Sequence, residues 1–401
     1  MDRCSADEVV ISQSAMADPL CRDRVQRLLS RIDCSKVSIT SQSELSEKVA
    51  TLGPRHLLER GGLARRGQSK RLIVLARLED GDIVQGYRWN ELRNGAYQTK
   101  KHGVLCHSAI EIQSVVGCAF DCTYCPYTSF LCINVDVEYF ADRVTELARS
   151  RRAQRLYKLN NRSDTLGLEP EYGLAPALVT RFSQIDGRYL MLYSKGHEVD
   201  ALTKLDHRQK TIASFTLTPE PVATLLEQGA APPVARLDAM RKLGNAGYPI
   251  RVRFSPIVPL TDWERIYEEL IKRLAAACRP EMVTMWMLSM IDFGSLGGIV
   301  PLDKLDARLV NAASDAAVSM KGQKGAPFPP VERARIYERI ASLVREHCPS
   351  AAVSLCLETE PVWDALGEHV VPRDGGNMLC NCGPKATPDA LVKLGTRAAM
   401  T

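Results

Sequence analysis

The chain has 401 residues, of which 45% are hydrophobic and 25% charged, proportions that are ordinary for a globular enzyme. Its net charge of +5 is the small difference between 52 basic and 47 acidic residues, so charge alone does not indicate a nucleic-acid partner. No apolar run reaches the roughly 18–20 residues that span a bilayer. The first residues are acidic and lack a secretory pattern. We therefore expect a cytoplasmic protein with no membrane partner.

The chain contains thirteen cysteines. An odd number of cysteines in a large chain without a secretion signal argues against a disulfide framework. Most of them are expected to be buried, inert thiols. Two groups are denser than the rest: Cys118, Cys122 and Cys125 have the spacing C-x3-C-x2-C, and Cys380 and Cys382 form a C-x-C pair.

Hydrophobic periodicity divides the chain into a mixed N-terminal part and a regular remainder. The first part has a helical pattern at residues 22–32, a strand at 71–77 and, between them, a basic loop at 60–70. That loop is expected to be solvated rather than to contact phosphates. From residue 108 onward, expected strands cover residues 109–116, 156–159, 189–193, 211–217, 250–256, 282–290 and 351–357, and expected helices cover 135–150, 174–182, 197–206, 234–244, 263–278 and 330–347.

Strands that alternate with helices predict a parallel sheet with crossover helices. Six or seven such units predict an α/β fold, a partial or open (β/α) barrel with N- and C-terminal extensions. We expect a small α/β extension at residues 1–107, the barrel core at 108–300, and a C-terminal extension at 301–401 that carries a helix, a further strand and the C-x-C pair. Chemistry in such barrels lies at the C-terminal ends of the strands, and Cys118 follows the first expected strand of the core.

The C-x3-C-x2-C group predicts a metal centre. Three thiolates so close in sequence can turn toward one point, and soft sulfur ligands select iron–sulfur clusters, zinc or copper(I). A structural zinc ion needs a fourth protein ligand, whereas a four-iron cluster held by three cysteines keeps one iron free for another ligand. The spacing therefore favours a [4Fe-4S] cluster. The alternative from a different class is a non-catalytic iron–sulfur or zinc protein.

Residues 117–127 (G-C-A-F-D-C-T-Y-C-P-Y) resemble the cluster loop of radical S-adenosylmethionine (SAM) enzymes. From about residue 108 to 270, the chain is similar to the spore photoproduct lyase family, which reverses a thymine–thymine photoproduct in DNA. This resemblance implies a partial (β/α)6 TIM-like barrel of the radical SAM type. It also implies a [4Fe-4S] cluster on Cys118, Cys122 and Cys125, bound SAM, and an electron donor such as flavodoxin or ferredoxin. Reductive cleavage of SAM at this cluster would give a 5′-deoxyadenosyl radical.

Three further positions match residues that contact SAM in that family. Ser163 lies in S-D-T-L-G, which is similar to the family's S-D-x-x-G turn. Lys195 lies in S-K-G-H-E-V-D, which is similar to T-K-x-x-x-V-D, and Thr216 takes the place of the serine in F-S-x-N. A lysine and hydroxyls at strand ends can hold a carboxylate and a ribose by charge-assisted hydrogen bonds. The structural alternatives are a surface lysine and backbone capping at turns.

The chain departs from the family at the residues that handle the radical. The lyases have a hydrogen-donating cysteine where this chain has Asn161, and a relay tyrosine where it has Pro126. Tyr124, the other relay tyrosine, is retained, and we expect it to lie against the cofactors as well as to act in catalysis. Cys356 ends an expected strand and is our candidate for a replacement hydrogen donor.

These departures lead us to expect a radical SAM enzyme that takes hydrogen from a nucleoside-like or other small polar substrate. A DNA photoproduct lyase with another hydrogen donor is the alternative, and nucleic acid is the less favoured partner. Because no fourth ligand is apparent beside Cys356, Cys380 and Cys382, we favour unligated thiols or a substrate-pocket role for them over a second metal site. Arg251 and Arg253 share one face of a strand, where they either meet an anion or are solvated.

Overall fold

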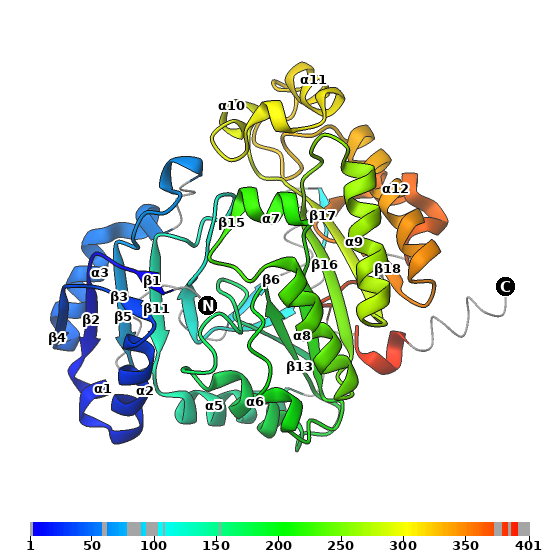
Figure 1. The fold of residues 1–401 in the computed structure, drawn as a ribbon. Helices are drawn as coiled ribbons and strands as arrows, with labels where there is room; N and C mark the ends of the chain where they lie inside the picture. The colour runs from blue at the N-terminus through cyan, green and yellow to red at the C-terminus, as the bar shows by residue number, and fades with distance from the viewer. Residues whose placement is uncertain are drawn as a thin grey trace. The chain divides into compact units, whose positions relative to one another are not determined.

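The computed structural model describes residues 3–57, 62–77, 90–93, 103–106, 109–151, 154–372, 379–383 and 386–391. The chain forms two compact units, each of which collects segments that are distant in sequence (Figure 1). Unit 1 comprises residues 1–90, 111–211 and 226–231, and unit 2 comprises residues 91–110, 212–225 and 232–401. The division expected from the sequence, at residues 107 and 300, stays a prediction.

Unit 1 contains a five-stranded sheet with the order β4-β2-β5-β11-β9. Its neighbouring strands are parallel except for β9, which runs antiparallel to β11. The central strands are completely buried runs of Val, Ile and Leu, as expected for strands covered on both faces. The strands are β2 (Val9–Ser12), β4 (Val37–Thr40), β5 (Leu72–Ala76), β9 (Val115–Gly117) and β11 (Phe130–Asn134), and the N-terminal helices are α1 (Gln13–Ala17), α2 (Pro19–Leu29) and α3 (Gln42–Leu57).

The rest of unit 1 is a strand–helix alternation. Strands β12 (Leu156–Leu159) and β13 (Tyr189–Ser194) pair in parallel. Helix α5 (Val137–Ser150) packs against α6 (Leu174–Phe182), as Figure 1 shows. Two short pairs complete the unit: parallel β1 (Cys4–Ser5) with β3 (Ile32–Asp33), and antiparallel β10 (Asp121–Cys122) with β15 (Glu227–Gln228).

The expected strand at residues 109–116 is two strands, β8 (Ala109–Ile112) and β9. The break is caused by Asn160, which has a positive φ of 50°, a conformation that asparagine tolerates. Its side-chain Oδ1 accepts hydrogen bonds from the backbone N–H of Ser114, at 2.9 Å, and from the Ser114 hydroxyl. Because the Ser114 N–H bonds to the Asn160 side chain, strand pairing is interrupted there. The chain then continues as β9, and the cysteine loop follows this strand of the five-stranded sheet.

The expected helix at residues 197–206 is wrong. The structure has one 3-10 turn, η3 (Leu202–Lys204), in this segment. The apolar residues Val199 and Leu202 are three positions apart, and the N–H of Leu202 bonds to the carbonyl of Val199 at 2.8 Å. This i to i+3 bonding is that of a tight turn rather than an α-helix.

Unit 2 contains parallel strands in the order β18-β17-β16-β14. Helix α9 packs between α8 and α12, as can be followed in Figure 1. A short antiparallel pair joins β19 to β7. The strands are β6 (Asn90–Arg93, at the boundary of the units in sequence), β7 (Val104–Leu105), β14 (Thr211–Thr216), β16 (Ile250–Ile257), β17 (Met282–Met287), β18 (Ala352–Leu355) and β19 (Glu358–Thr359); the helices are α7 (Glu220–Leu226), α8 (Pro233–Asn245), α9 (Trp263–Ala277), α10 (Phe293–Leu296), α11 (Ala307–Asp315), α12 (Pro330–His347) and α13 (Glu360–Leu366).

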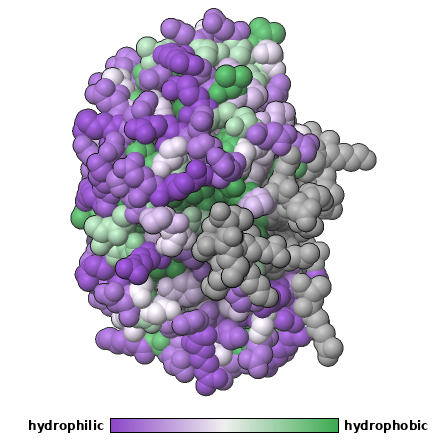
Figure 2. All heavy atoms as spheres, turned by 90° about the vertical axis from the view of Figure 1, so that its right-hand side faces the viewer, coloured by the Kyte–Doolittle hydropathy of each residue, from purple (hydrophilic) through white to green (hydrophobic). Residues whose placement is uncertain are grey.

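Figure 2 shows that most side chains on the face it presents are hydrophilic. In the part of the chain that the structure describes, no helix combines the length and the apolar character that crossing a membrane requires.

Candidate functional site

The cysteine loop begins at Gly117, the last residue of β9. Gly117 has a φ of 87°, and a Cβ atom at this position would lie 1.8 Å from the carbonyl oxygen of Phe130 on the paired strand. Only glycine combines this backbone conformation with such a close approach. Further along, the backbone N–H of Cys125 bonds to the carbonyl of Cys122 at 3.0 Å, which closes a turn between two of the predicted ligands.

A buried lysine anchors the same loop. Lys70 is 1% exposed, and its Nζ donates to Oδ1 of Asp121 at 2.9 Å and to the carbonyl of Thr128 at 2.8 Å. A buried ammonium that lost these acceptors would be strongly destabilising. The Lys70–Asp121 pair therefore fixes the middle of the loop to the strand that starts at Leu72.

The three predicted ligands lie close enough together to affect one another. Burial raises the pKa of the Cys118 thiol well above its usual value, and the neighbouring Cys125 and Cys122 raise it further. Burial also raises the pKa of Cys122, to about 12. Within the described ranges, no His, Cys, Asp and Glu side chains are grouped to hold a single metal ion. A four-iron cluster does not require such a group, because each thiolate binds a different iron. The thiol set therefore fits a cluster.

A buried carboxylate joins two of the predicted site residues. The Tyr124 hydroxyl donates to Oε1 of Glu227 at 2.7 Å, and Nζ of Lys195 lies 3.2 Å from the same oxygen. The Lys195 Nζ is also 5.6 Å from the centroid of the Tyr124 ring. The Glu227 side chain is 0% exposed, and burial, with Cys122 and Glu227 nearby, raises the pKa of Tyr124 well above its usual value. The phenol is therefore protonated and beside a carboxylate acceptor.

Glu227 was not predicted as a site residue. It lies in the two-residue strand β15, where it pairs with Cys122 of the loop. Nothing in its local sequence distinguishes it from a surface glutamate. An acceptor such as Glu227 could be expected only once Lys195 and Tyr124 are known to share one site. An ammonium and a phenol that are buried together need a compensating acceptor beside them.

Asp164 connects the two motifs that are predicted to hold SAM. Its carboxylate accepts hydrogen bonds from the Ser194 hydroxyl at 2.6 Å, from the Lys195 backbone N–H at 2.6 Å and from the Leu166 backbone N–H at 3.0 Å. Burial raises its pKa, while these bonds oppose that shift. Ser163, the preceding residue, donates its backbone N–H to the carbonyl of Asn160 at 3.0 Å. The structure thus places the Ser163 turn beside the start of the Lys195 segment.

The remaining predicted residues have different surroundings. Thr216 and Cys356 belong to unit 2. Thr216 is buried, and its carbonyl accepts from Arg236 at 3.1 Å. Cys356 accepts from Nη2 of Arg253 at 3.7 Å. Asn161 accepts a hydrogen bond from Nζ of Lys158. The predicted roles of Ser163, Lys195, Thr216, Tyr124 and Cys356 stay predictions.

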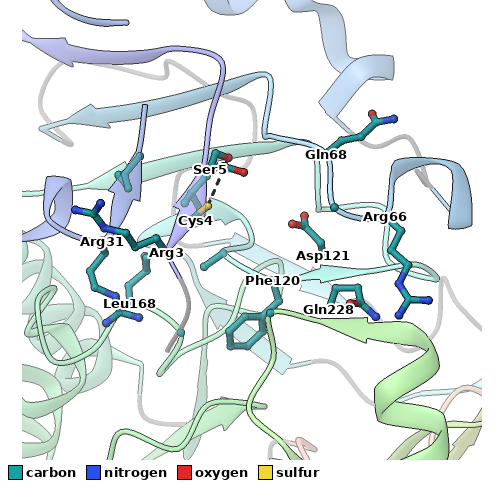
Figure 3. A pocket seen from close by; sticks show the side chains of 16 residues that line it. Arg3, Cys4, Ser5, Arg31, Arg66, Gln68, Phe120, Asp121, Leu168 and Gln228 are labelled. Atoms are coloured by element: carbon teal, nitrogen blue, oxygen red, sulfur yellow. Dashed lines mark hydrogen bonds between the residues drawn. The ribbon is translucent and has the colours of Figure 1, made fainter. Parts of the chain in front are cut away.

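A pocket of about 360 Å³ borders the cysteine loop within unit 1. The loop contributes Phe120 and Asp121, and Arg3, Arg31 and Arg66 supply positive charge. Arg3 and Arg31 lie on one side of the pocket and Arg66 on the other (Figure 3). The carboxylate of Glu171 already pairs with Arg31 at 2.7 Å. Arg66 belongs to the basic loop noted in the sequence, so part of that loop lines a cavity beside the candidate site.

Comparison with known proteins shows a similarity to one family. A family model described as spore photoproduct lyase matches residues 98–294, a range that includes all three ligand cysteines, Ser163, Lys195 and Thr216. The spore photoproduct lyase of Bacillus subtilis (strain 168) is 27% identical over 173 residues, which are 41% of this chain and 51% of that protein. Over this range the chain is similar to the spore photoproduct lyases.

A second lyase-family relative, from Geobacillus sp. (strain Y412MC61), is 27% identical over 179 residues, or 41% of this chain and 50% of that protein. The chain thus spans about half the length of the curated relatives it matches.

Solved structures of spore photoproduct lyases share the fold of this chain. A mutant lyase with bound AdoMet and dinucleoside spore photoproduct aligns with a TM-score of 0.63 and 18% identity, over 88% of this chain and 99% of that one. A lyase complexed with the dinucleoside spore photoproduct aligns with a TM-score of 0.62 and 18% identity, over 87% of this chain and 98% of that one. The predicted α/β fold of the radical SAM type, with a partial barrel, is confirmed.

Proposed function

We propose that the chain is a radical SAM lyase that reverses a thymine–thymine photoproduct of the spore type in DNA. The observation that carries this proposal is the partly buried cysteine loop, whose Tyr124 contacts Glu227, the partner of Lys195. The family match, which covers every predicted site residue except Cys356, supports it. The sequence alone places a nucleoside-like or other small polar substrate first, and the comparisons favour the DNA-repair alternative over it.

The residues present fit the two cofactors that the family uses. Cys118, Cys122 and Cys125 would hold a [4Fe-4S] cluster, and Ser163, Lys195 and Thr216 would hold SAM. When bound, these cofactors supply a 5′-deoxyadenosyl radical by reductive cleavage of SAM. A flavodoxin or ferredoxin would supply the electron. Replacing dithionite with either protein in the assay below tests this part of the proposal.

The chain's own residues orient SAM and exclude water. Lys195 offers an ammonium to the SAM carboxylate, and its backbone is held in place by Asp164. Glu227 keeps the buried ammonium compensated before SAM binds. Tyr124 is protonated at its phenol oxygen, and Glu227 can accept that proton if Tyr124 loses an electron in a radical relay. The site therefore provides a proton path from Tyr124 without any change of backbone position.

The hydrogen donor must differ from that of the lyases, because the amide of Asn161 has no readily transferred hydrogen atom. We assign the donor role to the thiol of Cys356. A thiol S–H is the kind of donor that the family uses at the missing position. Replacing Cys356 with alanine should leave SAM cleavage intact and lower the yield of repaired thymine for each 5′-deoxyadenosine formed.

The deciding experiment gives the anaerobically reconstituted protein dithionite, SAM and the dinucleoside spore photoproduct. Chromatography with mass spectrometry then measures 5′-deoxyadenosine and released thymidine. We expect both products from the wild type and neither from a variant with Cys118, Cys122 and Cys125 replaced by alanine. Cleavage of SAM without thymidine would overturn the substrate, and absence of both products would overturn the enzymatic function.

One observation favours a second candidate, a small polar or nucleoside-like substrate: the donor position is occupied by Asn161. A screen of deuterated nucleosides for transfer of deuterium into 5′-deoxyadenosine tests it. Transfer from a free nucleoside, with none from the photoproduct, would replace the lyase proposal with this one.

A further inference from the structure

Four cysteines from three segments of unit 2 gather in one place. Cys106 directly follows β7, and Cys356 lies two residues before β19. The antiparallel pairing of these strands, with Leu105 opposite Glu358, brings the two segments together. The Ser354 hydroxyl donates to the carbonyl of Leu379 at 3.0 Å, which ties the Cys356 strand to the residue before Cys380. Cys382 follows two residues later.

The C-x-C segment is held rigidly by its central residue. Asn381 is 4% exposed; its amide nitrogen donates to the Ser214 hydroxyl at 2.9 Å, and its carbonyl accepts from Nη1 of Arg251 at 2.5 Å. The fully buried Arg251 also donates to the carbonyl of Ala386 at 2.6 Å and to Glu281 at 2.5 Å. Arg251 therefore meets neither a substrate anion nor solvent. It fixes the backbone between two cysteines.

The thiols of this cluster lie near one another. Cys380 and Cys382 are hydrogen-bonded to each other through their side chains, and Cys106 and Cys356 lie near enough to act on Cys380 electrostatically. The Cys382 contact, burial and the other two thiols raise the pKa of Cys380 well above its usual value. Cys380 thus keeps its S–H bond at neutral pH. The guanidinium of Arg253 donates to the sulfur of Cys356 at 3.7 Å.

We propose that Cys380 and Cys382 are a redox-active dithiol, which replenishes the hydrogen atom that Cys356 gives away. This proposal rests on the proposed function for the role of Cys356, while the redox activity of the pair stands on its own. A C-x-C disulfide closes a very small ring, and strained disulfides are the easily reduced, catalytic ones.

The atoms and electrons balance over two turnovers. In the first, the S–H bond of Cys356 breaks, its hydrogen atom forms a C–H bond in the product, and the sulfur radical regains a hydrogen atom from Cys380. In the second, Cys356 regains its hydrogen atom from Cys382, and the two remaining sulfur radicals form an S–S bond. Two S–H bonds are lost, one S–S bond is made, and two product molecules each carry one hydrogen atom. One SAM is consumed in each turnover, and a small thiol resets the pair.

The rival is that these four thiols bind a metal. In the part of the chain that the structure describes, no group of His, Cys, Asp and Glu is placed to hold a single ion, and none of these four thiols is in a disulfide. Metal analysis of the variant that lacks Cys118, Cys122 and Cys125 decides the point. If this variant retains stoichiometric zinc or iron, and the further change Cys380→Ser removes that metal, the proposal of a redox-active dithiol would be overturned.

The first arm of the test needs no SAM chemistry. The reconstituted protein is equilibrated anaerobically in glutathione buffers of increasing oxidation, alkylated and digested. We expect a Cys380–Cys382 disulfide to form reversibly, while Cys278 and Cys348 of the same unit are recovered as alkylated thiols. A pair that stays reduced across the whole glutathione range would overturn the proposal. This result is independent of whether the protein cleaves SAM.

The second arm measures turnover of the dinucleoside photoproduct with no thiol reductant present. We expect about one disulfide for every two repaired molecules, and product formation that stops early in Cys380→Ser and Cys382→Ser but recovers with added dithiothreitol. Cys278→Ser is the matched control and should behave as the wild type. Sustained wild-type turnover by the Cys380→Ser/Cys382→Ser protein without reductant would overturn the replenishing role. Failure to cleave SAM at all would instead refute the proposed function and leave the first arm valid.

Discussion

The Tyr124 hydroxyl donates a 2.7 Å hydrogen bond to Glu227, a residue 103 positions away in the sequence. The carboxylate is completely buried and also pairs with Lys195. A phenol that is oxidised must lose its proton, and the nearest acceptor in unit 1 that the structure gives it is Glu227. If Tyr124 has the proposed relay role, the contact would couple radical transfer to proton movement on a residue outside every predicted motif.

Replacing Glu227 with glutamine should slow product formation by about 100-fold or more, since a general base contributes roughly 10²- to 10⁴-fold. Glutamine keeps the size and one acceptor oxygen but is far less basic. The measurement is thymidine release at saturating SAM, together with iron content, which should be unchanged. Tyr124→Phe is the matched variant, and the double variant should be no slower than the slower single variant. Equal rates for Glu227→Gln and the wild type would refute the proton path.

Replacing Lys195 with methionine should weaken SAM binding about 10- to 100-fold, since a hydrogen bond to a charged group is worth about 1.5–3 kcal/mol. The methionine preserves the length of the side chain and removes its charge. Equilibrium binding of SAM to the reconstituted cluster protein measures the effect. Lys204→Met, at an exposed lysine of the nearby η3 turn, is the control. Unchanged affinity in Lys195→Met would mean that Lys195 has only the structural role of pairing with Glu227.

The ligand loop and the Lys195 motif could be predicted because their signals are local. Cys118, Cys122 and Cys125 lie within eight residues of each other, and Lys195 directly follows an apolar strand. Glu227 could not be predicted, because only the two-residue pairing of β10 with β15 brings it to Cys122. The break at Ser114 depends on Asn160, which is 46 residues away. Contacts of this kind arise from tertiary packing and leave no periodicity in the chain.

Replacing Gly117 with alanine should prevent the cluster loop from forming. The added Cβ would lie 1.8 Å from a backbone oxygen of the paired strand β11, so one of the two strands would have to move. We expect loss of most iron after reconstitution, measured by iron and sulfide analysis. Gly173→Ala is the control, because Gly173 has a φ of 72° but nothing within 4 Å of the added atom. Its cost should be limited to backbone strain of about 1 kcal/mol. Full iron content in Gly117→Ala would contradict the predicted requirement.

Replacing Lys70 with methionine should destabilise unit 1 by about 3–5 kcal/mol, the cost of breaking a buried ion pair. The change leaves Asp121 and the Thr128 carbonyl without the ammonium that they share. Urea unfolding measures the stability. Lys48→Met removes a lysine that pairs with Glu8 but is 38% exposed, and it should cost less than about 1 kcal/mol. Similar costs for the two variants would show that the loop does not depend on the Lys70 anchor.

Glu169 gives the protein a pH-dependent stability of predictable sign. Its carboxylate accepts the backbone N–H groups of Gly173 and Ala175, each at 2.8 Å. Burial nevertheless raises its pKa from 4.5 to about 7. Between these two values the folded protein holds a proton that the unfolded chain has released. Since stability rises with pH only where the unfolded state binds more protons, this group makes the free energy of unfolding fall as the pH rises from 4.5 to 7.

Glu169→Gln removes this titration and provides the test. Urea unfolding of both proteins at pH 5 and pH 8 gives the stability of the wild type relative to the variant. We expect that relative stability to be lower at pH 8 by up to about 3 kcal/mol, because one pKa unit corresponds to about 1.4 kcal/mol. Glu146→Gln, at an exposed glutamate of α5, should show a pH-independent difference. The stability of the wild type relative to Glu169→Gln could instead stay constant or rise with pH. That result would mean that the hydrogen bonds from the backbone N–H groups stabilise the carboxylate more than its burial destabilises it.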